Sequence, residues 1–247
     1  MNPAENLLLP GERLDDLQRN GFRIIQRPDA FRFGTDSVLL ADFAAPKKRD
    51  VCADLGCGTG GISLILLSRH QDLSVTGIEI QPDIADMARR SALLNHVEDR
   101  FTVLCGDLRA AHETLGRCGF SLAVCNPPYF NEGGALKSES ETKRLARHEG
   151  DMPPVELTSA AARLLKNGGR LAVIYPAFRA LEMMRAMEDA GIAPKRVRPV
   201  QGMEGKPPKF VLLDGIKGAS EGLHWMPPLV LLHRDGTPTE EWRRIYD

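Results

Sequence analysis

The chain has 247 residues, of which 43% are hydrophobic and 26% are charged, and its formal net charge is −1. This length suits one sizeable hydrophobic core, and the composition is that of an ordinary soluble globular protein. No apolar run reaches membrane-spanning length, and the amino terminus has no secretory signal pattern, so we predict a cytoplasmic protein without membrane association.

The first 49 residues predict a short amino-terminal element that packs on the rest of the chain. Residues 22–25 and 31–33 are strand-like, and residues 36–43 have the apolar pattern of a helix. We expect residues 50–247 to form the core, so that both parts make one structural domain.

From residue 50 onward, short apolar runs alternate with helix-like segments, which is typical of a parallel α/β sheet. The runs are almost continuously apolar, as in strands that are buried on both faces. The predicted strands are residues 51–55, 74–80, 101–105, 120–125 and 170–175, and the predicted helices are residues 61–70, 82–97 and 154–166.

The last third of the chain changes character. Residues 197–201, 210–213 and 229–233 have strand patterns without long helices between them, which predicts an antiparallel end to the sheet. Residues 131–150 are polar, Gly-rich and charged, and we interpret them as a loop that faces the substrate.

The five cysteines indicate a reducing compartment. Their number is odd, and no two of them form a CxxC pair. Cys52, Cys105 and Cys125 lie in apolar runs, so we expect them to be small core residues, and we predict no metal site.

A glycine-rich turn follows the first predicted strand, in the segment Asp54-Leu55-Gly56-Cys57-Gly58-Thr59-Gly60. Glycines allow a backbone to turn sharply and to approach a ligand closely, and the next helix presents free N–H groups to that ligand. Gly56, Gly58 and Gly61 also satisfy the GxGxxG dinucleotide pattern. The turn therefore predicts a nucleoside cofactor without choosing between NAD and S-adenosylmethionine (SAM), and a purely structural turn is the alternative.

Two acidic residues lie at the same predicted sheet edge. Glu79 ends the second strand, where a carboxylate can accept hydrogen bonds from ribose hydroxyls. Asp107 follows the third strand, where it either accepts from an adenine amino group or caps a helix over residues 108–115. Glu79 therefore supports a nucleoside cofactor without choosing one, with an incidental strand-end carboxylate as the alternative, and Asp107 by itself does not decide between its two roles.

The segment Asn126-Pro127-Pro128-Tyr129 follows the fourth predicted strand. The lone pair of an exocyclic amine is delocalised into its ring, and acceptors aimed at both N–H bonds free it for methyl transfer. The side-chain oxygen of Asn126 and the carbonyl of Pro127 are suitable acceptors in a stiff backbone, and Tyr129 can stack on a planar substrate. The segment therefore predicts methyl transfer from SAM to an amino or amide nitrogen, mostly by alignment, with an ordinary strand-to-loop turn as the alternative.

These motifs resemble those of class I SAM-dependent methyltransferases with an Asn-Pro-Pro-Tyr motif. More narrowly, the chain resembles the bacterial valine-tRNA adenine N6-methyltransferase family over nearly its whole length. The resemblance is carried by residues 34–40, 54–60, 126–130, 146–149, 227–229 and 245–246. Residues 146–149 and the two carboxyl-terminal segments are the most particular to this family.

The resemblance implies a Rossmann-like fold with a mostly parallel seven-stranded sheet and an antiparallel carboxyl-terminal end. It implies that Asn126, Pro127, Pro128 and Tyr129 align the N6 amine of an adenine in tRNA. The cofactor residues that it implies are Gly34, Thr35, Asp36, Asp54, Gly56, Gly58, Gly60, Glu79, Ile80, Asp107, Leu108 and Asn126. The expected substrate residues are Phe130, Arg147 and His148, although Arg147 and His148 equally suit a salt bridge with Glu149.

The net charge does not by itself indicate nucleic acid binding, so an RNA enzyme of this composition needs a local basic patch. Three basic clusters qualify, namely Lys47-Lys48-Arg49, then Lys143, Arg144 and Arg147, and finally Lys195, Arg196, Arg198, Lys206, Lys209 and Lys217. We expect Lys206 and Lys209 to contact RNA, and a solvated face is the alternative for each cluster.

Other functions remain open at this point. The amino or amide nitrogens of a protein glutamine, of guanine N2 and of DNA adenine could all bind the same acceptors, so methyltransferases of these three kinds are alternatives. The glutamine N5-methyltransferases carry a helical substrate domain before the glycine turn. This chain has about 50 residues there, which are too few for such a domain. A non-catalytic SAM- or RNA-binding protein has no need for the Asn-Pro-Pro-Tyr segment. No Tyr-x-x-x-Lys set supports a NAD oxidoreductase, and the sequence does not indicate the oligomeric state.

Overall fold

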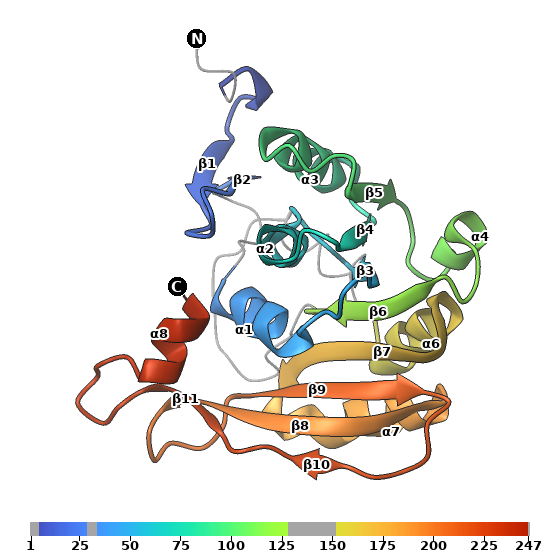
Figure 1. Ribbon diagram of the computed structural model, residues 1–247, viewed down its shortest axis with the longest axis vertical. Coiled ribbons are helices and arrows are strands. Elements are labelled where there is room, and N and C mark those ends of the chain that lie inside the picture. Colours follow the sequence, from blue (N-terminus) through green and yellow to red (C-terminus); the bar gives the residue numbers. More distant parts are fainter. Residues whose placement is uncertain (1–4, 29–33, 128–151, 247) are drawn as a thin grey trace, which may run out of the picture.

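A central nine-stranded sheet organises the molecule, and the computed structural model describes residues 5–28, 34–127 and 152–246 (Figure 1). The strands of the sheet are β3 (Val51–Leu55), β4 (Ser74–Glu79), β5 (Phe101–Cys105), β6 (Phe120–Cys125), β7 (Leu165–Pro176), β8 (Ile192–Met203), β9 (Phe210–Lys217), β10 (His224–Trp225) and β11 (Leu229–Leu232). Their order is β10-β8-β9-β7-β6-β3-β4-β5, and β11 also pairs with β8.

The directions of the strands confirm the expected fold class. The five adjacent strands β7, β6, β3, β4 and β5 run parallel to one another. Strand β9 is antiparallel to both β7 and β8. Strands β10 and β11 run parallel to β8 and enlarge the seven-stranded core to nine strands. The sequence predicted β11 but not β10, because a strand of two residues is too short to show a periodic pattern.

Helices cover both faces of the sheet (Figure 1). One layer contains α1 (Thr35–Ala44), α2 (Gly61–Arg69) and α3 (Pro82–Leu94), and the other contains α4 (Ala111–Leu115), α6 (Pro154–Leu164) and α7 (Ala180–Asp189). Side chains along β6 alternate between the two cores, as expected for a strand: Leu122 and Val124 face the first layer, and Ala123 and Cys125 face the second. This double coverage explains the continuously apolar runs in the sequence.

Three cysteine thiols are fully buried beside this sheet, and burial raises the pKa of Cys52, Cys57 and Cys125 well above its usual range. These thiols are therefore protonated and chemically quiet. Cys105 is only partly buried, because it lies at the end of the edge strand β5.

The amino-terminal segment contains the 3-10 helix η1 (Glu5–Leu7) and a hairpin of β1 (Arg13–Asp16) and β2 (Arg23–Gln26). The predicted strand at residues 22–25 corresponds to β2, whereas residues 31–33 lie outside the described residues. The hairpin packs on α3, where Asn95 accepts a hydrogen bond from the backbone N–H of Arg23 at 2.8 Å and donates to its carbonyl at 2.6 Å. An ion pair of 2.6 Å joins Arg90 of α3 to Glu12.

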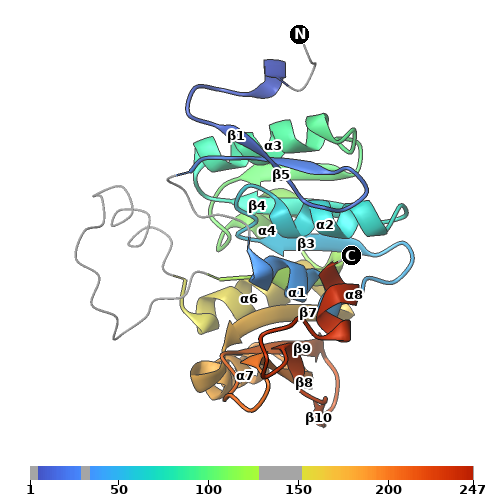
Figure 2. The ribbon, with the colours of Figure 1, turned by 90° about the vertical axis from the view of Figure 1, so that its left-hand side faces the viewer.

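The carboxyl-terminal helix α8 (Glu240–Tyr246) lies beside α1, and the β1–β2 hairpin lies beside α3 (Figure 2). The guanidinium groups of Arg19 and Arg69 both donate to the carbonyl of Ile245, at 2.6 and 2.7 Å. The β1–β2 hairpin and α2 are thus both tied to the carboxyl-terminal helix α8.

None of the described helices combines the length and the hydropathy that crossing a membrane requires.

Candidate functional site

The site predicted from the sequence lies at the carboxyl edge of the parallel strands. Strands β3, β4, β5 and β6 are neighbours in the sheet and run in the same direction, so the residues that follow them gather at one edge. The chain also reverses its direction of winding here, because β4 lies on one side of β3 and β6 on the other. Such a switch point is where open α/β sheets bind ligands.

The glycine turn between β3 and α2 is built by backbone hydrogen bonds. The N–H groups of Gly56 and Cys57 both donate to the carbonyl of Ile78 in β4, at 2.9 and 3.0 Å. Gly60 has φ +90°, and a Cβ atom at this position would lie 2.9 Å from the ring of Phe101. Only glycine fits this position without strain, because both the backbone conformation and the space exclude a side chain.

Asp54 lies at the end of β3 and is completely buried. Its Oδ2 accepts a hydrogen bond of 2.6 Å from the hydroxyl of Ser63 in α2, and its Oδ1 has no hydrogen-bond partner among the described residues. Burial raises the pKa of Asp54 to about 6, while the hydrogen bonds from Ser63 lower it and the charge of Glu79 raises it further. Nothing in the sequence singled out Ser63.

Glu79 at the end of β4 is 6% exposed, and backbone donors hold both of its oxygens. One oxygen accepts from the N–H of Gly58 at 3.0 Å, and the other accepts from the N–H of Gln81 at 2.9 Å. Each oxygen keeps acceptor capacity, because a carboxylate has about four lone-pair sites. Glu79 therefore fixes the glycine turn to β4 and still presents acceptors at the sheet edge. The adjoining Ile80 is 40% exposed.

Asp107 after β5 binds Arg109 twice over, because its carboxylate accepts a hydrogen bond of 2.9 Å from the backbone N–H of Arg109 and also binds the guanidinium of that residue. The helix that follows begins at Ala111, so the alternative of an N-cap for residues 108–115 was wrong. Two nitrogens of the Arg109 guanidinium bind the carboxylate, at distances of 2.6 to 3.0 Å, and this hydrogen bonding lowers the pKa of Asp107. Nothing in the sequence singled out Arg109, although its spacing of two residues from Asp107 suits a local ion pair. Leu108 between them is buried.

The amino terminus of α1 faces the start of β9. Gly34 occupies the N-cap position, and Thr35 and Asp36 lie in the first turn of the helix. Burial raises the pKa of Asp36, and the positive charge of Lys209 opposes this shift. This segment and the lysine are therefore close enough to interact electrostatically.

The predicted catalytic segment is described in part. Asn126 directly follows β6 and is half-buried, and Pro127 is buried. The remaining predicted residues of this segment and of the substrate site lie outside the described residues, namely Pro128, Tyr129, Phe130, Arg147 and His148.

Most of the basic residues at 195–217 are engaged within the protein, so they do not form one patch. The guanidinium of Arg196 pairs with the buried Asp214, and that of Arg198 pairs with Glu241 at 2.7 Å. Lys195 donates to the carbonyl of Ser220, and Lys217 donates to those of Ala162 and Leu165. Lys206 and Lys209 lie in the turn between β8 and β9 at the carboxyl edge, where the ammonium group of Lys209 is 5.4 Å from the centroid of the Phe210 ring.

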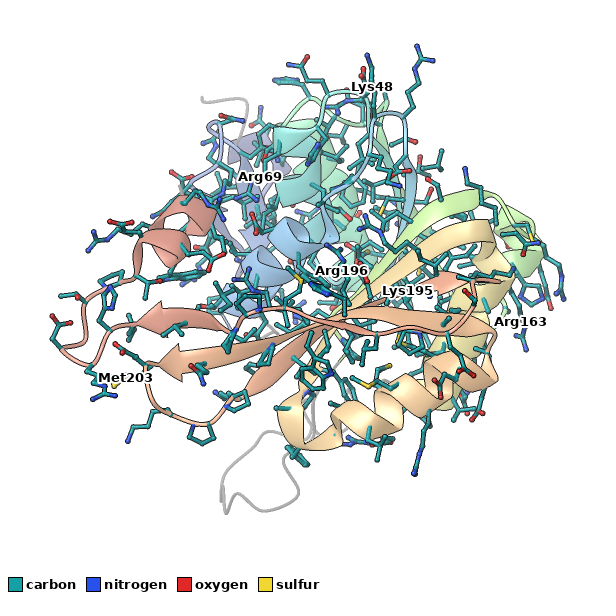
Figure 3. All side chains as sticks on the ribbon, turned by 60° about the horizontal axis from the view of Figure 1, so that its bottom comes forward. Lys48, Arg69, Arg163, Lys195, Arg196 and Met203 are labelled. Atoms are coloured by element: carbon teal, nitrogen blue, oxygen red, sulfur yellow. The ribbon has the colours of Figure 1, made fainter. Side chains whose placement is uncertain are left out.

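The cluster Lys47-Lys48-Arg49 lies elsewhere, in the loop that precedes β3 at the amino edge of the sheet. Lys48 and Met203, after which the β8–β9 turn begins, are on different sides of the molecule (Figure 3). The first basic cluster is therefore remote from the predicted site, and the cluster at residues 143–147 lies outside the described residues.

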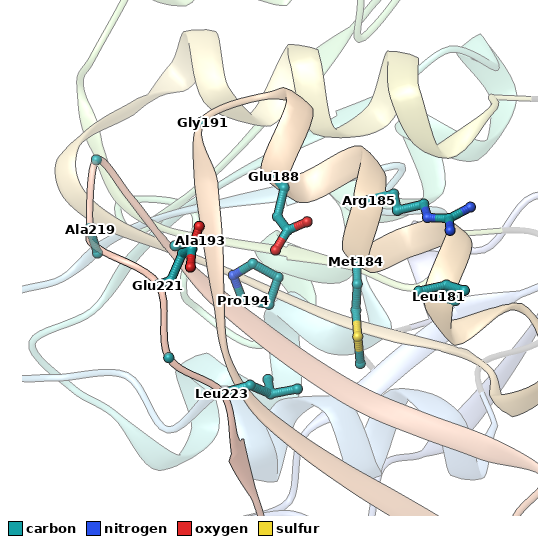
Figure 4. A pocket seen from close by; sticks show the side chains of 12 residues that line it. Leu181, Met184, Arg185, Glu188, Gly191, Ala193, Pro194, Ala219, Glu221 and Leu223 are labelled. Atoms are coloured by element: carbon teal, nitrogen blue, oxygen red, sulfur yellow. The ribbon is translucent and has the colours of Figure 1, made fainter.

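A hollow of about 590 Å³ lies at the amino end of β8 (Figure 4). Residues of α7 and of the segment before β10 line it, and they include Arg185, Glu188, Glu221 and Leu223. None of its lining residues belongs to the site predicted from the sequence.

Within the described part of the chain, no three His, Cys, Asp or Glu residues are grouped so that they could hold a metal ion.

Comparisons with known proteins agree with this geometry. The family model described as methyltransferase small domain matches residues 29–191. A protein from Porphyromonas gingivalis named tRNA1(Val) (adenine(37)-N6)-methyltransferase is 34% identical over 199 residues, which cover 78% of this chain and 77% of that protein. A protein of the same name from Tolumonas auensis is 30% identical over 193 residues, covering 78% and 79%.

Solved structures show the same fold. A predicted O-methyltransferase from Agrobacterium tumefaciens has a TM-score of 0.71 at 22% identity, over 86% of this chain and 95% of that one. A geranyl diphosphate methyltransferase solved in complex with SAM has a TM-score of 0.54 at 15% identity, over 73% and 84%. These matches confirm the expected class I fold. The chain therefore belongs to the methyltransferase small-domain family, together with these two curated relatives, and it is a SAM-dependent methyltransferase.

Proposed function

We propose that this methyltransferase modifies the N6 amine of an adenine in tRNA, with valine tRNA as its substrate. The observation that carries this proposal is the likeness to two curated relatives whose name gives this reaction, over more than three quarters of each chain. The position of Asn126 supports it, because the half-buried amide directly follows β6 at the switch point of the sheet. A cytoplasmic location belongs to the same proposal.

We propose that the cofactor lies over the glycine turn. The buried and unpartnered Oδ1 of Asp54 fits a hydrogen-bond donor or a cationic group of a ligand, because a buried acceptor without a partner is costly. The carboxylate of Glu79, fixed by the N–H groups of Gly58 and Gln81, suits ribose hydroxyls. The other members of the proposed cofactor site are Gly34, Thr35, Asp36, Gly56, Gly60, Ile80, Asp107, Leu108 and Asn126. When bound, SAM supplies an activated methyl group.

We propose that the protein contributes alignment rather than strong acid–base chemistry. The side-chain oxygen of Asn126 and the carbonyl of Pro127 accept hydrogen bonds from the two N–H bonds of the target amine, which pulls the nitrogen towards tetrahedral geometry. Its lone pair is then available to the methyl group, and the product readily loses a proton to solvent. Tyr129 and Pro128 complete this segment in the proposal, with the aromatic ring stacked on the adenine.

A methyl-transfer assay with labelled SAM and bulk tRNA tests this proposal. The tRNA is taken from cells that lack this protein, incubated with enzyme and SAM, and then digested to nucleosides. Label in N6-methyladenosine is the expected result. Label that appears in N2-methylguanosine, in rRNA or in a protein glutamine would assign the enzyme to another nitrogen. No transfer despite SAM binding would favour a non-catalytic binding protein.

A further inference from the structure

An exposed aromatic residue lies at the same sheet edge as Asn126. Phe178 belongs to the 3-10 helix η2 (Ala177–Arg179), which directly follows β7, and 78% of its surface is exposed. Exposing a phenylalanine to this extent gives up the free energy of burying it, which is about 1.5–3 kcal/mol for a large apolar side chain. Leu181, which follows in α7, is also exposed, at 60%.

The sheet brings Phe178 to the edge at which Asn126 lies. Cys125, the residue before Asn126, pairs with Val173 in the parallel neighbour β7. Each residue of an extended chain spans about 3.3 Å, so Phe178 is at most about 17 Å from Val173. This spacing suits a nucleotide that neighbours the target in one RNA strand.

The turn that carries Lys206 and Lys209 meets the segment of Phe178 through the backbone, and the ammonium group of Lys209 lies 5.4 Å from the centroid of the Phe210 ring. The backbone N–H of Ala177, the residue before Phe178, donates to the carbonyl of Lys209 at 3.1 Å. The positive charge of Lys209 also lowers the pKa of Asp36 in the first turn of α1, opposing the effect of burial, so this lysine is close enough to interact with a proposed cofactor residue as well. Among the described residues, neither Lys206 nor Lys209 forms an ion pair, whereas the neighbouring Arg179 is paired with Glu182 at 2.7 Å.

We infer that Phe178 is a stacking platform for a base next to the target adenine, and that Lys206 and Lys209 bind the adjoining phosphates. This inference depends on the chain acting on tRNA, as proposed above. An exposed aromatic ring beside unpaired lysines is the combination by which proteins hold single-stranded nucleic acid, with the base on the ring and the backbone on the cations. A net charge of −1 makes such a local arrangement necessary, because the overall field does not attract RNA.

Steady-state kinetics on tRNA test the role of the ring. In Phe178→Ala, the KM for tRNA should rise about fivefold to a hundredfold, the range that loss of one base–aromatic stack gives. The affinity for SAM, measured by calorimetry, and the thermal midpoint should stay at their wild-type values, because the side chain is exposed. Phe178→Trp should restore the KM and Phe178→Leu should not, since leucine is apolar but has no π face.

Trp225 offers a matched aromatic control. It is 64% exposed in β10, and β8, β9 and β7 lie between that strand and β6. Trp225→Ala should leave the KM for tRNA unchanged. An equal rise in Trp225→Ala and Phe178→Ala would overturn the assignment to Phe178, as would a rescue by leucine.

Salt titrations of RNA binding test the lysines. In Lys206→Gln/Lys209→Gln, the slope of log affinity against log salt should fall by about 1.4 to 1.8, because two phosphate contacts are lost. The double variant Lys47→Gln/Lys48→Gln, at the amino edge, removes the same charge and should keep the wild-type slope. The same slope in the Lys206/Lys209 variant as in wild type would overturn this part of the inference.

Failure of the inference and failure of the proposed function give different results. If wild-type enzyme methylates tRNA and Phe178→Ala does so with an unchanged KM, the stacking platform is wrong and the function stands. If wild-type enzyme transfers no methyl group to tRNA, the proposed function itself is wrong.

Discussion

The two oxygens of the Asp54 carboxylate have different surroundings: Oδ2 accepts a hydrogen bond of 2.6 Å from Ser63, whereas Oδ1 is buried without a partner in the described part of the chain. A buried carboxylate that is half-satisfied is costly to ionise, and this is why its pKa is raised to about 6.

Asp54 should make the ligand-free protein less stable as the pH rises. Burial raises its pKa from 3.8 to about 6, so the folded protein holds the proton more tightly than the unfolded chain. The free energy of unfolding therefore falls as the pH rises through this window, by up to about 3 kcal/mol from this residue alone. Urea unfolding at several pH values should show a flatter profile for Asp54→Asn than for wild type. Identical profiles would mean that Asp54 titrates normally.

Loss of the Glu79 carboxylate should weaken SAM binding. Glu79→Ala removes the acceptor that holds the N–H of Gly58, and the affinity should fall by about 1–3 kcal/mol, the scale of a hydrogen bond to a charged group. Calorimetric titration with SAM measures this directly, and Glu113→Gln, an exposed acid of α4, provides a control. An affinity equal to that of wild type would place the ribose elsewhere.

Asn126→Ala should remove methyl transfer and leave SAM binding mostly intact, because it deletes an acceptor for the reacting amine. By analogy with the loss of one preorganised polar group in other enzymes, kcat should fall about a hundredfold to a thousandfold. Single-turnover transfer and calorimetry on the same preparation separate the two effects. Wild-type activity in this variant would contradict alignment by Asn126.

A methyl group at position 60 should be incompatible with the native turn. In Gly60→Ala, the new Cβ would meet the ring of Phe101 at 2.9 Å and would force φ near +90° on a non-glycine residue. The free energy of unfolding should drop by about 1–3 kcal/mol, measured by urea denaturation. In the double variant Gly60→Ala/Phe101→Leu, the loss of unfolding free energy should be smaller than the sum of the losses in the two single variants. The difference, which is the coupling energy of the two residues, should be about 0.5–3 kcal/mol. Strict additivity would show that the contact with Phe101 carries none of the cost.

The sequence was most informative about the residues that directly follow the parallel strands. An apolar run followed by glycines, or by Glu79 or Asn126, predicts one edge of a parallel sheet, because all carboxyl ends of such strands meet there. The strand boundaries were less accurate. Strand β7 begins at Leu165 rather than at residue 170, and its register with β6 shifts between Phe120 and Leu122, which no periodic pattern reveals. The division into an amino-terminal element at residues 1–49 and a core at residues 50–247, within one structural domain, stays a prediction.

Partners that are distant in the sequence escaped prediction. Ser63 binds Asp54 across a strand–turn–helix unit, and Arg196 pairs with Asp214 across two antiparallel strands. Composition showed six basic residues at positions 195–217, but only the fold decides which of them satisfy internal carboxylates and carbonyls and which face solvent. Phe178 had no signal, because a single aromatic residue after a strand is read as core until its exposure is known.

The most direct test uses two valine tRNA transcripts, one with adenine and one with guanine at position 37, the position in the name of the curated relatives. Each is incubated with the wild-type enzyme and labelled SAM, with Asn126→Ala in parallel. We expect label in the adenine transcript with wild-type enzyme, recovered as N6-methyladenosine, no label in the guanine transcript, and initial rates with Asn126→Ala that are lower by about a hundredfold or more. Equal labelling of both transcripts by wild-type enzyme, or full labelling by Asn126→Ala, would contradict adenine N6 transfer at position 37 by the Asn126 segment.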